Sequence, residues 1–126
     1  MCHQTVSLVA RHLEANGIPT VVLGCARDIV ESAGVARFLF SDFPLGNSCG
    51  RPFDVDSQRT VVAMALELLD SATAPRTTVQ TPFRWAVDSA WKRDFYRLDL
   101  SPEQIARARA EFDGQKAILS DKLRAP

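Results

Sequence analysis

Hydrophobic residues recur along this chain with helical spacing in some segments and as short unbroken runs in others. Residues 4–16 carry apolar side chains three to four positions apart, and Gly17 followed by Pro19 is a stop signal for a helix. Residues 20–24 are a β-rich run without polar alternation, which is typical of a strand buried on both faces of a parallel sheet. Residues 26–33 then predict a short helix.

The same alternation continues to about residue 72. Residues 37–43 predict a second strand, which Pro44 ends. The next helix is capped by Asp56 or Ser57, and its expected buried row is Val61, Met64, Ala65, Leu68, Leu69 and Ala72. Strands that alternate with helices predict an α/β fold of three layers with a mostly parallel sheet, doubly wound as in Rossmann or flavodoxin-like folds.

Two predicted strands are too few for such a sheet. A parallel pair leaves unpaired edges and open apolar surface, so at least one more strand is needed. A helix that begins near Gln4 would normally follow a strand, and no residues are present to form it. We therefore expect the sheet to lack its first strand, which would lie upstream of Met1 or come from another chain.

The pattern changes after residue 72. Residues 73–100 contain prolines and aromatic side chains with no sustained period, which favours an arm that covers the domain or contacts a partner. The aromatic residues are Phe83, Trp85, Trp91, Phe95 and Tyr96. The predicted organisation is an α/β core over residues 1–75 and an aromatic arm with a C-terminal helix over residues 76–126, within one domain.

A specific signature marks the start of the C-terminal helix. Ser101 is a helix cap, Pro102 suits the first helical position, and Gln104 completes a capping box. The expected apolar row of this helix is sparse and consists of Ile105, Ala108, Phe112 and Leu119.

Composition indicates a single globular domain. The chain has 126 residues, of which 46% are hydrophobic and 24% charged, and this balance is typical of folded soluble proteins. No apolar run reaches the ~18 residues of a membrane span, and no secretory signal is visible at the N-terminus. We therefore expect a cytoplasmic protein whose three cysteines are free thiols rather than a disulfide framework.

A net charge of zero conceals an asymmetry. Residues 1–75 hold five basic residues against eight acidic ones, and residues 76–126 hold ten against seven. Opposed halves favour packing on each other or on a neighbouring subunit, although offsets of this size are equally consistent with a solvated surface. No basic cluster with interleaved aromatic residues resembles a nucleic-acid-binding surface, so neither nucleic acid nor membrane is an expected partner.

The cysteines map to one edge of the predicted sheet, where α/β folds place their ligands. Cys2 would follow the missing strand, Cys25 follows the strand that ends at Gly24, and Cys49 lies in the loop after the second strand. Cys2 and Cys25 precede helices whose dipoles favour a thiolate. A cysteine such as Cys25 is more often a small core residue. Cys2 and Cys49, in polar loops, are therefore the candidate catalytic residues.

The loop of residues 43–52 is the second candidate feature. Its two glycines and two prolines build a rigid connection that lets the backbone approach a ligand, with Arg51 available for an anion, and a tight crossover explains the composition equally well. His3 beside Cys2 is a candidate base or ligand, but this pair lacks the spacing of a zinc site. The candidate substrate-binding residues are His3, Asn47 and Arg51, and no metal or cofactor is expected.

Several segments also match a known family. They are Cys-His-Gln-Thr-Val at 2–6, Leu-Glu-Ala at 13–15, Gly-Ile-Pro-Thr-Val at 17–21, Ala-Arg-Asp-Ile at 26–29, Asp-Phe-Pro-Leu-Gly-Asn at 42–47 and Thr-Pro-Phe-Arg-Trp at 81–85. In these motifs the chain resembles the selenoprotein B family, the substrate-activating subunits of glycine, sarcosine, betaine and D-proline reductases, with their cysteine-containing relatives. The resemblance covers nearly the whole chain but only the C-terminal part of longer members.

The resemblance implies a redox role in the reductive cleavage of a C–N bond in a small amine or amino acid. It implies a selenol or thiol at the turn before Gln4 that attacks the substrate's α-carbon, and other reductase subunits or further copies as partners. The residues that would precede Cys2 are absent, so Cys2 is the nucleophile, a resolving thiol or a remnant. We expect the reading frame to extend upstream of Met1, where a selenocysteine encoded by UGA or a second cysteine would stand.

Two functions of other classes remain open. The chain could be a truncated non-catalytic fragment or interaction module that completes a sheet with another chain. It could instead be a metal-binding module that holds zinc through Cys2, His3 and Cys49.

Overall fold

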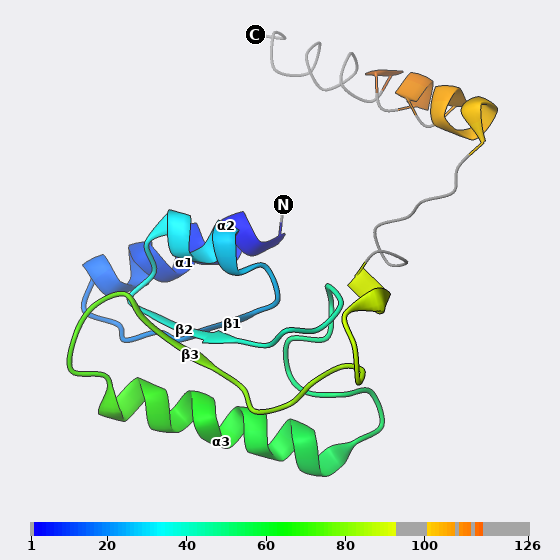
Figure 1. The fold of residues 1–126 in the computed structure, drawn as a ribbon. Coiled ribbons are helices and arrows are strands. Elements are labelled where there is room, and N and C mark those ends of the chain that lie inside the picture. The colour runs from blue at the N-terminus through cyan, green and yellow to red at the C-terminus, as the bar shows by residue number, and fades with distance from the viewer. Residues whose placement is uncertain (1, 93–100, 108, 112, 115–126) are drawn as a thin grey trace, which may run out of the picture. The chain divides into compact units, whose positions relative to one another are not determined.

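The computed structural model describes residues 2–92, 101–107, 109–111 and 113–114. Within them the elements are α1 (Cys2–Ala15), β1 (Val22–Gly24), α2 (Arg27–Ala33), β2 (Arg37–Phe40), α3 (Val55–Ser71) and β3 (Thr77–Gln80). The strands form a parallel sheet in the order β1-β2-β3, with α1 and α2 on one face and α3 on the other (Figure 1). The predicted α/β class, with a parallel sheet between layers of helices, is confirmed.

Two apolar clusters hold the helices on the sheet, one on each face. On the first face, Ala10 of α1 and Val30 of α2 pack with Phe38 of β2. On the second face, Leu39 of β2 packs with the buried row of α3, which consists of Val61, Ala65 and Leu68. Neighbouring residues of β2 therefore point to opposite clusters, as the alternation of a strand requires, and this burial on both faces explains why the strand has no polar position after Arg37.

The third strand was not visible in the sequence pattern. Thr77–Gln80 pairs in parallel with β2, so the sheet extends past residue 75 into the segment expected to form an arm. Only Val79 of this strand packs against the α3 cluster, and the other three residues are polar. A short edge strand with one covered face carries few apolar residues and gives a weak signal.

The two connections between strands have opposite hands. Both advance in the same direction across the sheet, yet α2 and α3 lie on opposite faces (Figure 1). About 98% of such crossovers are right-handed, so one of the two departs from the general rule. Residues 41–54, between β2 and α3, give the chain the length it needs to reach the second face.

The helix ends lie where the sequence predicted them, except that the cap of α3 is at a different residue. Gly34 ends α2 in the left-handed conformation, with φ of 72°, as its position predicted. The cap of α3 is Asp54, whose carboxylate accepts from the backbone N–H of Ser57 at 3.0 Å. The expected caps, Asp56 and Ser57, instead lie inside the first turn of the helix. A capping side chain accepts from the amide two or three residues further on, and Asp54 stands three residues before Ser57.

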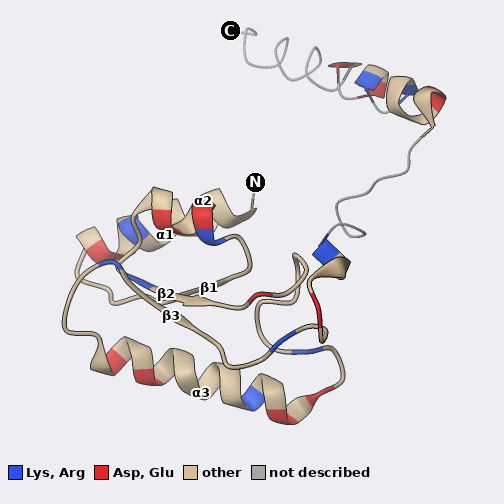
Figure 2. Ribbon diagram, viewed as in Figure 1, with Lys and Arg blue, Asp and Glu red and all other residues tan. Residues whose placement is uncertain are grey.

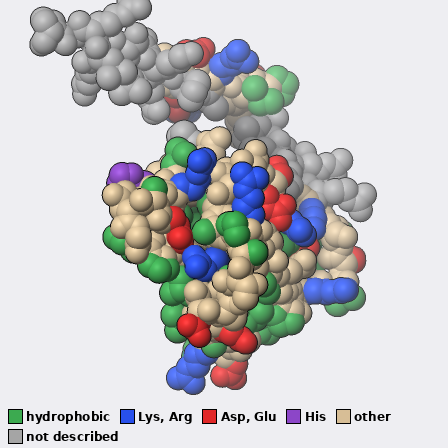
Figure 3. All heavy atoms as spheres, turned by 90° about the vertical axis from the view of Figure 1, so that its left-hand side faces the viewer, with side chains coloured by type: hydrophobic (Ala, Val, Ile, Leu, Met, Phe, Trp, Pro, Cys, Tyr) green, Lys and Arg blue, Asp and Glu red, His purple; other side chains and the backbone are tan. Residues whose placement is uncertain are grey.

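A polar cluster joins three elements at the amino-terminal edge of the sheet. The Glu14 carboxylate accepts from the backbone N–H and the hydroxyl of Thr20, and from Arg37 at 2.9 Å. Burial by itself raises the pKa of Glu14, but the hydrogen bonds from Thr20 and the attraction of Arg37 outweigh it and lower the pKa below its ordinary value. Figure 3 faces the side that is on the left in Figure 1, where basic and acidic side chains lie close together.

The chain divides into two compact units, Met1–Ser89 and Ala90–Pro126. In the second unit Ser101 and Gln104 form the expected reciprocal capping box, and residues 102–107 are helical. Ile105 of the expected apolar row is 52% exposed. The other row residues predicted there, Ala108, Phe112 and Leu119, and the aromatic residues Phe95 and Tyr96, lie outside the described residues.

Among the described residues, no helix has both the length and the apolar character that crossing a membrane requires.

Candidate functional site

The carboxyl-terminal edge of the sheet brings α1, β1 and the loop after β2 together. The His3 imidazole accepts from the backbone N–H of Cys25 through Nε2, at 3.1 Å. The ring lies so close to Gly24 that a Cβ there would be 2.9 Å from His3 Cδ2 and 3.2 Å from Phe38 Cε2. Because Nε2 accepts this bond, the neutral ring carries its proton on Nδ1. His3 thus fixes the turn that leads from β1 into α2.

The Cys25 thiol lies against the loop that follows β2. Burial raises the pKa of this thiol, while backbone amides of Asn47 and Phe43 hydrogen-bond to it and lower the pKa, and the charge of Asp42 raises it further. The net pKa is above the ordinary value, so Cys25 is a protonated thiol at neutral pH. The two amides would stabilise charge that develops on this sulfur, as in an oxyanion hole.

The loop of residues 43–52 is held in one shape by its own contacts. The buried Ser41 hydroxyl donates to the carbonyl of Ser48 at 3.2 Å, which closes the first part of the loop. Gly50 has φ of 95°, and a Cβ there would lie 2.8 Å from the Gln58 backbone in the first turns of α3. Glycine is required here for both reasons, because the loop backbone rests directly on the helix.

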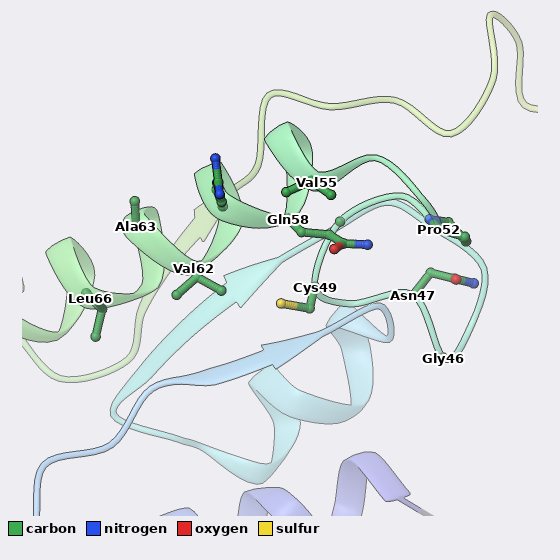
Figure 4. A pocket seen from close by; sticks show the side chains of 11 residues that line it. Gly46, Asn47, Cys49, Pro52, Val55, Gln58, Val62, Ala63 and Leu66 are labelled. Carbon is green, nitrogen blue, oxygen red and sulfur yellow. The ribbon is translucent and has the colours of Figure 1, made fainter.

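Cys49 lies beside an open pocket of about 750 Å³ between this loop and α3 (Figure 4). Its thiol points towards the side of α3 that carries Val62. The lining is largely apolar, with Asn47, Gln58 and Arg59 as its polar members. The neighbouring Phe53 is fully exposed with φ of 62°, an uncommon conformation for a residue other than glycine. Cys49 therefore combines an exposed thiol with a concave apolar surface.

The segment after β3 packs on the same loop. Arg51 donates from Nη2 to the backbone carbonyl of Arg84. The Trp85 ring meets Phe43 edge-on, with ring centroids 5.4 Å apart. In Figure 2 the two arginine-bearing segments, blue, lie side by side near the start of α3. Part of the aromatic segment thus covers the loop, and the Arg51 side chain has a structural contact besides any role towards an anion.

The predicted site residues fall into three places along this edge. Cys2 is exposed at the first residue of α1, next to His3. Asn47 and Cys49 line one pocket, whereas Arg51 is bound to Arg84. No described contact joins Cys2 to Cys49. Among the described residues, no group of three or more His, Cys, Asp or Glu side chains could hold a metal ion, so the zinc module gains no support.

The contacts of Cys25 at this edge could not be predicted from the sequence. Its neighbours in the chain, Gly24 and Ala26, give no sign of the loop amides that meet its sulfur, because those contacts are formed between residues about twenty positions apart. The signal that pointed in this direction was topological, since all three cysteines were expected at the carboxyl edge.

Comparison with known proteins gives one distant relationship. The chain is 25% identical over 84 residues to D-proline reductase subunit gamma of Acetoanaerobium sticklandii, a match that covers 67% of this chain. The chain spans only 35% of the length of that relative. No family model matches the chain. No solved structure matches it either. The similarity supports a distant relationship to the D-proline reductases and does not single out the selenoprotein B members.

Proposed function

We propose that this chain is a thiol-dependent redox subunit that takes part in the reductive cleavage of a C–N bond in a small amino acid or amine. The observation that carries the proposal is the similarity to D-proline reductase subunit gamma over 84 residues. The arrangement of thiols supports it, because Cys2, Cys25 and Cys49 belong to segments at the carboxyl edge, where parallel sheets bind their ligands. The finer assignment is to a cysteine-containing relative of selenoprotein B.

Reductive cleavage of a C–N bond requires two electrons and two protons, and a pair of thiols supplies them. The C–N bond breaks, the carbon gains a hydrogen, the nitrogen gains a proton, and the two sulfurs end as a disulfide. Such a reaction needs one sulfur that attacks as a thiolate and another that resolves the intermediate. Cys2 and Cys49 are the exposed thiols and take these roles in the proposal.

The remaining roles follow from position. The apolar pocket at Cys49 suits the carbon skeleton of a small substrate, and Asn47, which lines it, is proposed to bind one polar end. Arg51, in the same loop but bound to the Arg84 carbonyl, is proposed to bind the other. His3 is proposed to bind substrate near Cys2 through its Nδ1–H, since Nε2 is occupied by Cys25. The partners are other subunits of a reductase or further copies of the chain.

The test is a single-turnover reaction of the reduced protein with D-proline, which the name of the relative suggests as the first substrate. We expect loss of two thiols per turnover, counted by mass spectrometry, and formation of a ring-opened amino acid. Cys49→Ser and Cys2→Ser should each abolish turnover, whereas Glu31→Gln, which changes an exposed ion pair outside the candidate site, serves as the control.

Two results would contradict the proposal. One is a substrate-dependent turnover that survives in the double variant Cys2→Ser/Cys49→Ser. The other is the absence of any thiol oxidation with D-proline, glycine, sarcosine and betaine in a chain whose melting is cooperative.

A further inference from the structure

The pocket beside Cys49 contains a single charged residue among the described residues that line it, and that residue is Arg59 of α3. It stands within an apolar face of the helix, because Val55, Val62 and Leu66 lie four, three and seven positions away and line the same pocket. These three side chains are between 44% and 61% exposed. The pocket therefore offers a cation together with an open hydrocarbon surface.

The Arg59 guanidinium has no bound partner within the described part of the chain. No hydrogen bond or ion pair joins it to another described residue, although Asp56 lies one turn earlier in the same helix. Arg51, by contrast, already donates to the Arg84 carbonyl. An arginine presents five donors in a planar fork that matches the two oxygens of a carboxylate. Arg59 is thus the lining residue best equipped to bind a carboxylate.

The two amide side chains of the lining suit the other end of an amino acid. Gln58 donates from Nε2 to the Arg51 carbonyl at 2.9 Å, and Asn47 donates from Nδ2 to the Pro44 carbonyl at 3.3 Å. Because one N–H of each amide is engaged, their oxygens are well matched to the N–H of an amine. A carboxylate only accepts hydrogen bonds, so its donors come from an arginine.

Arg59 and Cys49 stand on two walls of the pocket that touch each other. A Cβ on Gly50 would lie 2.8 Å from the Gln58 backbone, so the loop rests on the helix at this point. Cys49 is the residue before Gly50, and Arg59 is the residue after Gln58. Consecutive Cα atoms are about 3.8 Å apart, so both residues are held close to that contact. The Cys49 thiol points towards α3 (Figure 4).

We propose that Arg59 is the main binding group for the carboxylate of the substrate and that it holds the substrate's α-carbon beside the Cys49 thiol. The α-carbon is bonded to the carboxylate carbon, so fixing the carboxylate also fixes the position of that carbon. The hydrocarbon part of the substrate contacts Val62 and Leu66. The substrate class is then an α-amino acid with an apolar body rather than an amine without a carboxylate. This assignment rests on the proposed function for the reaction, whereas carboxylate binding at Arg59 is testable without it.

Arg59 matters for the encounter because both partners are negative. The attacking group is a thiolate, and the attacked carbon carries a carboxylate. Like charges repel, so an uncharged site disfavours their approach. A guanidinium beside the carboxylate offsets this repulsion, and it has no such effect on a neutral analogue of the same shape. The comparison of an acid with its amide therefore isolates the contribution of Arg59.

The experiment alkylates the full reduced chain with 2-bromohexanoate and, separately, with 2-bromohexanamide. In both reactions a thiolate attacks the α-carbon, the C–S bond forms, the C–Br bond breaks and bromide leaves. Peptide mapping of a time course gives the rates at Cys49 and at Cys2, an exposed thiol that is not among the lining residues. We expect the acid-to-amide rate ratio at Cys49 to be about fivefold above that at Cys2, as a charge-assisted pair provides. Added salt should reduce the difference.

Variants then identify the cation. Arg59→Gln should abolish the excess at Cys49, and Arg59→Lys, which keeps the charge but not the planar fork, should retain part of it. Arg11→Gln is the matched control for net charge, because Arg11 lies on α1 and donates to the Ala33 carbonyl, and it should leave the ratio unchanged. The ratio cancels any change in the thiol itself, since both reagents meet the same sulfur. Arg59 is exposed, so its variants should keep the Tm of the wild type.

Several outcomes would overturn the role of Arg59. One is an acid-to-amide ratio at Cys49 no higher than at Cys2, and another is a ratio that falls more in Arg51→Gln than in Arg59→Gln. Reduction of D-proline by Arg59→Gln with an unchanged KM would also overturn it and would leave the proposed function in place. Conversely, an Arg59-dependent ratio in a chain that reduces no amino acid would support the carboxylate site and contradict the proposed function.

Discussion

At the scale of single residues, side chains fill the space around Gly24. A methyl group on its Cα would meet side-chain atoms of His3 and Phe38 at 2.9 to 3.2 Å. We expect Gly24→Ala to destabilise the fold by about 1–3 kcal/mol, the usual cost of overpacking. Thermal or urea unfolding measures it. Gly114→Ala, where nothing lies within 4 Å, is the control and should change stability little.

A double-mutant cycle identifies the cause of that loss. If the His3 ring is the obstacle, His3→Ala should relieve most of the effect of Gly24→Ala, because the two changes remove one shared clash. Additive effects of the two substitutions would show that strain elsewhere in the β1–α2 turn is responsible.

Glu14 provides a prediction about pH. Its pKa is lower in the folded protein than its ordinary value of 4.5, so its contribution is present above that value and is lost as the pH falls through the folded pKa. We expect Glu14→Gln to cost about 1–2 kcal/mol at neutral pH, since it weakens hydrogen bonds to a charged acceptor. The difference from the wild type should vanish in acid. Unfolding curves at several pH values measure this.

The control for Glu14 is an exposed ion pair in the same unit. Glu31 pairs with Arg27 one helical turn away, with both side chains largely exposed. Glu31→Gln should therefore cost only a few tenths of a kcal/mol at any pH. If Glu14→Gln lowers the stability by the same amount in acid, the shape of the side chain rather than its charge is what stabilises the fold at this position.

The thiols should differ in reactivity according to their surroundings. Because burial raises the pKa of Cys25, its thiolate is scarce at neutral pH, and its sulfur is also partly covered. We expect iodoacetamide to modify Cys25 at least about tenfold more slowly than Cys49, because the thiolate is the form that reacts. Peptide mapping of a time course gives both rates in one sample. Equal rates would show that the loop opens faster than the reagent reacts.

At the scale of elements, α3 depends on the cap that the loop supplies. The Asp54 carboxylate accepts from the amide of Ser57, and Ser57 in turn accepts from the Arg51 amide and donates to the Asp54 carbonyl. Asp54→Ala should destabilise the first unit by about 1 kcal/mol, and Asp54→Asn, which keeps an acceptor, by only a few tenths. Thermal unfolding compares the two. Equal losses would show that the charge near the helix start, not the hydrogen bond, is what matters.

The elements themselves show what the sequence can specify. Gly34 and the Ser101 capping box were correctly identified because each acts within one turn of its own helix. Helix α1 and the row of α3 followed from spacing alone, since a helix repeats over many residues. Strand β3 was missed because four residues, one of them apolar and buried in part, are too few to show a period.

At the scale of the whole molecule, the topology is what could not be predicted from the sequence. The three-layer arrangement followed from alternating elements, but no local signal shows that α3 crosses to the face opposite α2. That choice depends on the long segment 41–54 and on the two clusters it connects. Similarly, the order of Cys2, Cys25 and Cys49 along one edge was predictable, whereas the contact of Cys25 with the amides of Asn47 and Phe43 was not. Such contacts arise only when distant segments pack.

The loop and the segment that covers it should loosen together. Phe43 and Trp85 meet edge-on, and the Arg51 guanidinium donates to the carbonyl of the preceding residue, Arg84, so the two contacts hold one stretch of chain at both ends of the loop. An aromatic pair contributes about 0.5–1.5 kcal/mol beyond its buried area. Trp85→Ala should therefore speed amide exchange throughout residues 41–51 while leaving the strands protected.

Trp91→Ala is the matched control for this effect. Its ring belongs to the second unit, and the ammonium of Lys92 lies 5.5 Å from the ring centroid. We expect exchange in residues 41–51 to be unchanged in that variant. Because the loop amides of Phe43 and Asn47 meet the Cys25 sulfur, Trp85→Ala should also raise the alkylation rate of Cys25. Faster exchange without faster alkylation would show that the loop moves as a rigid body and keeps the thiol covered.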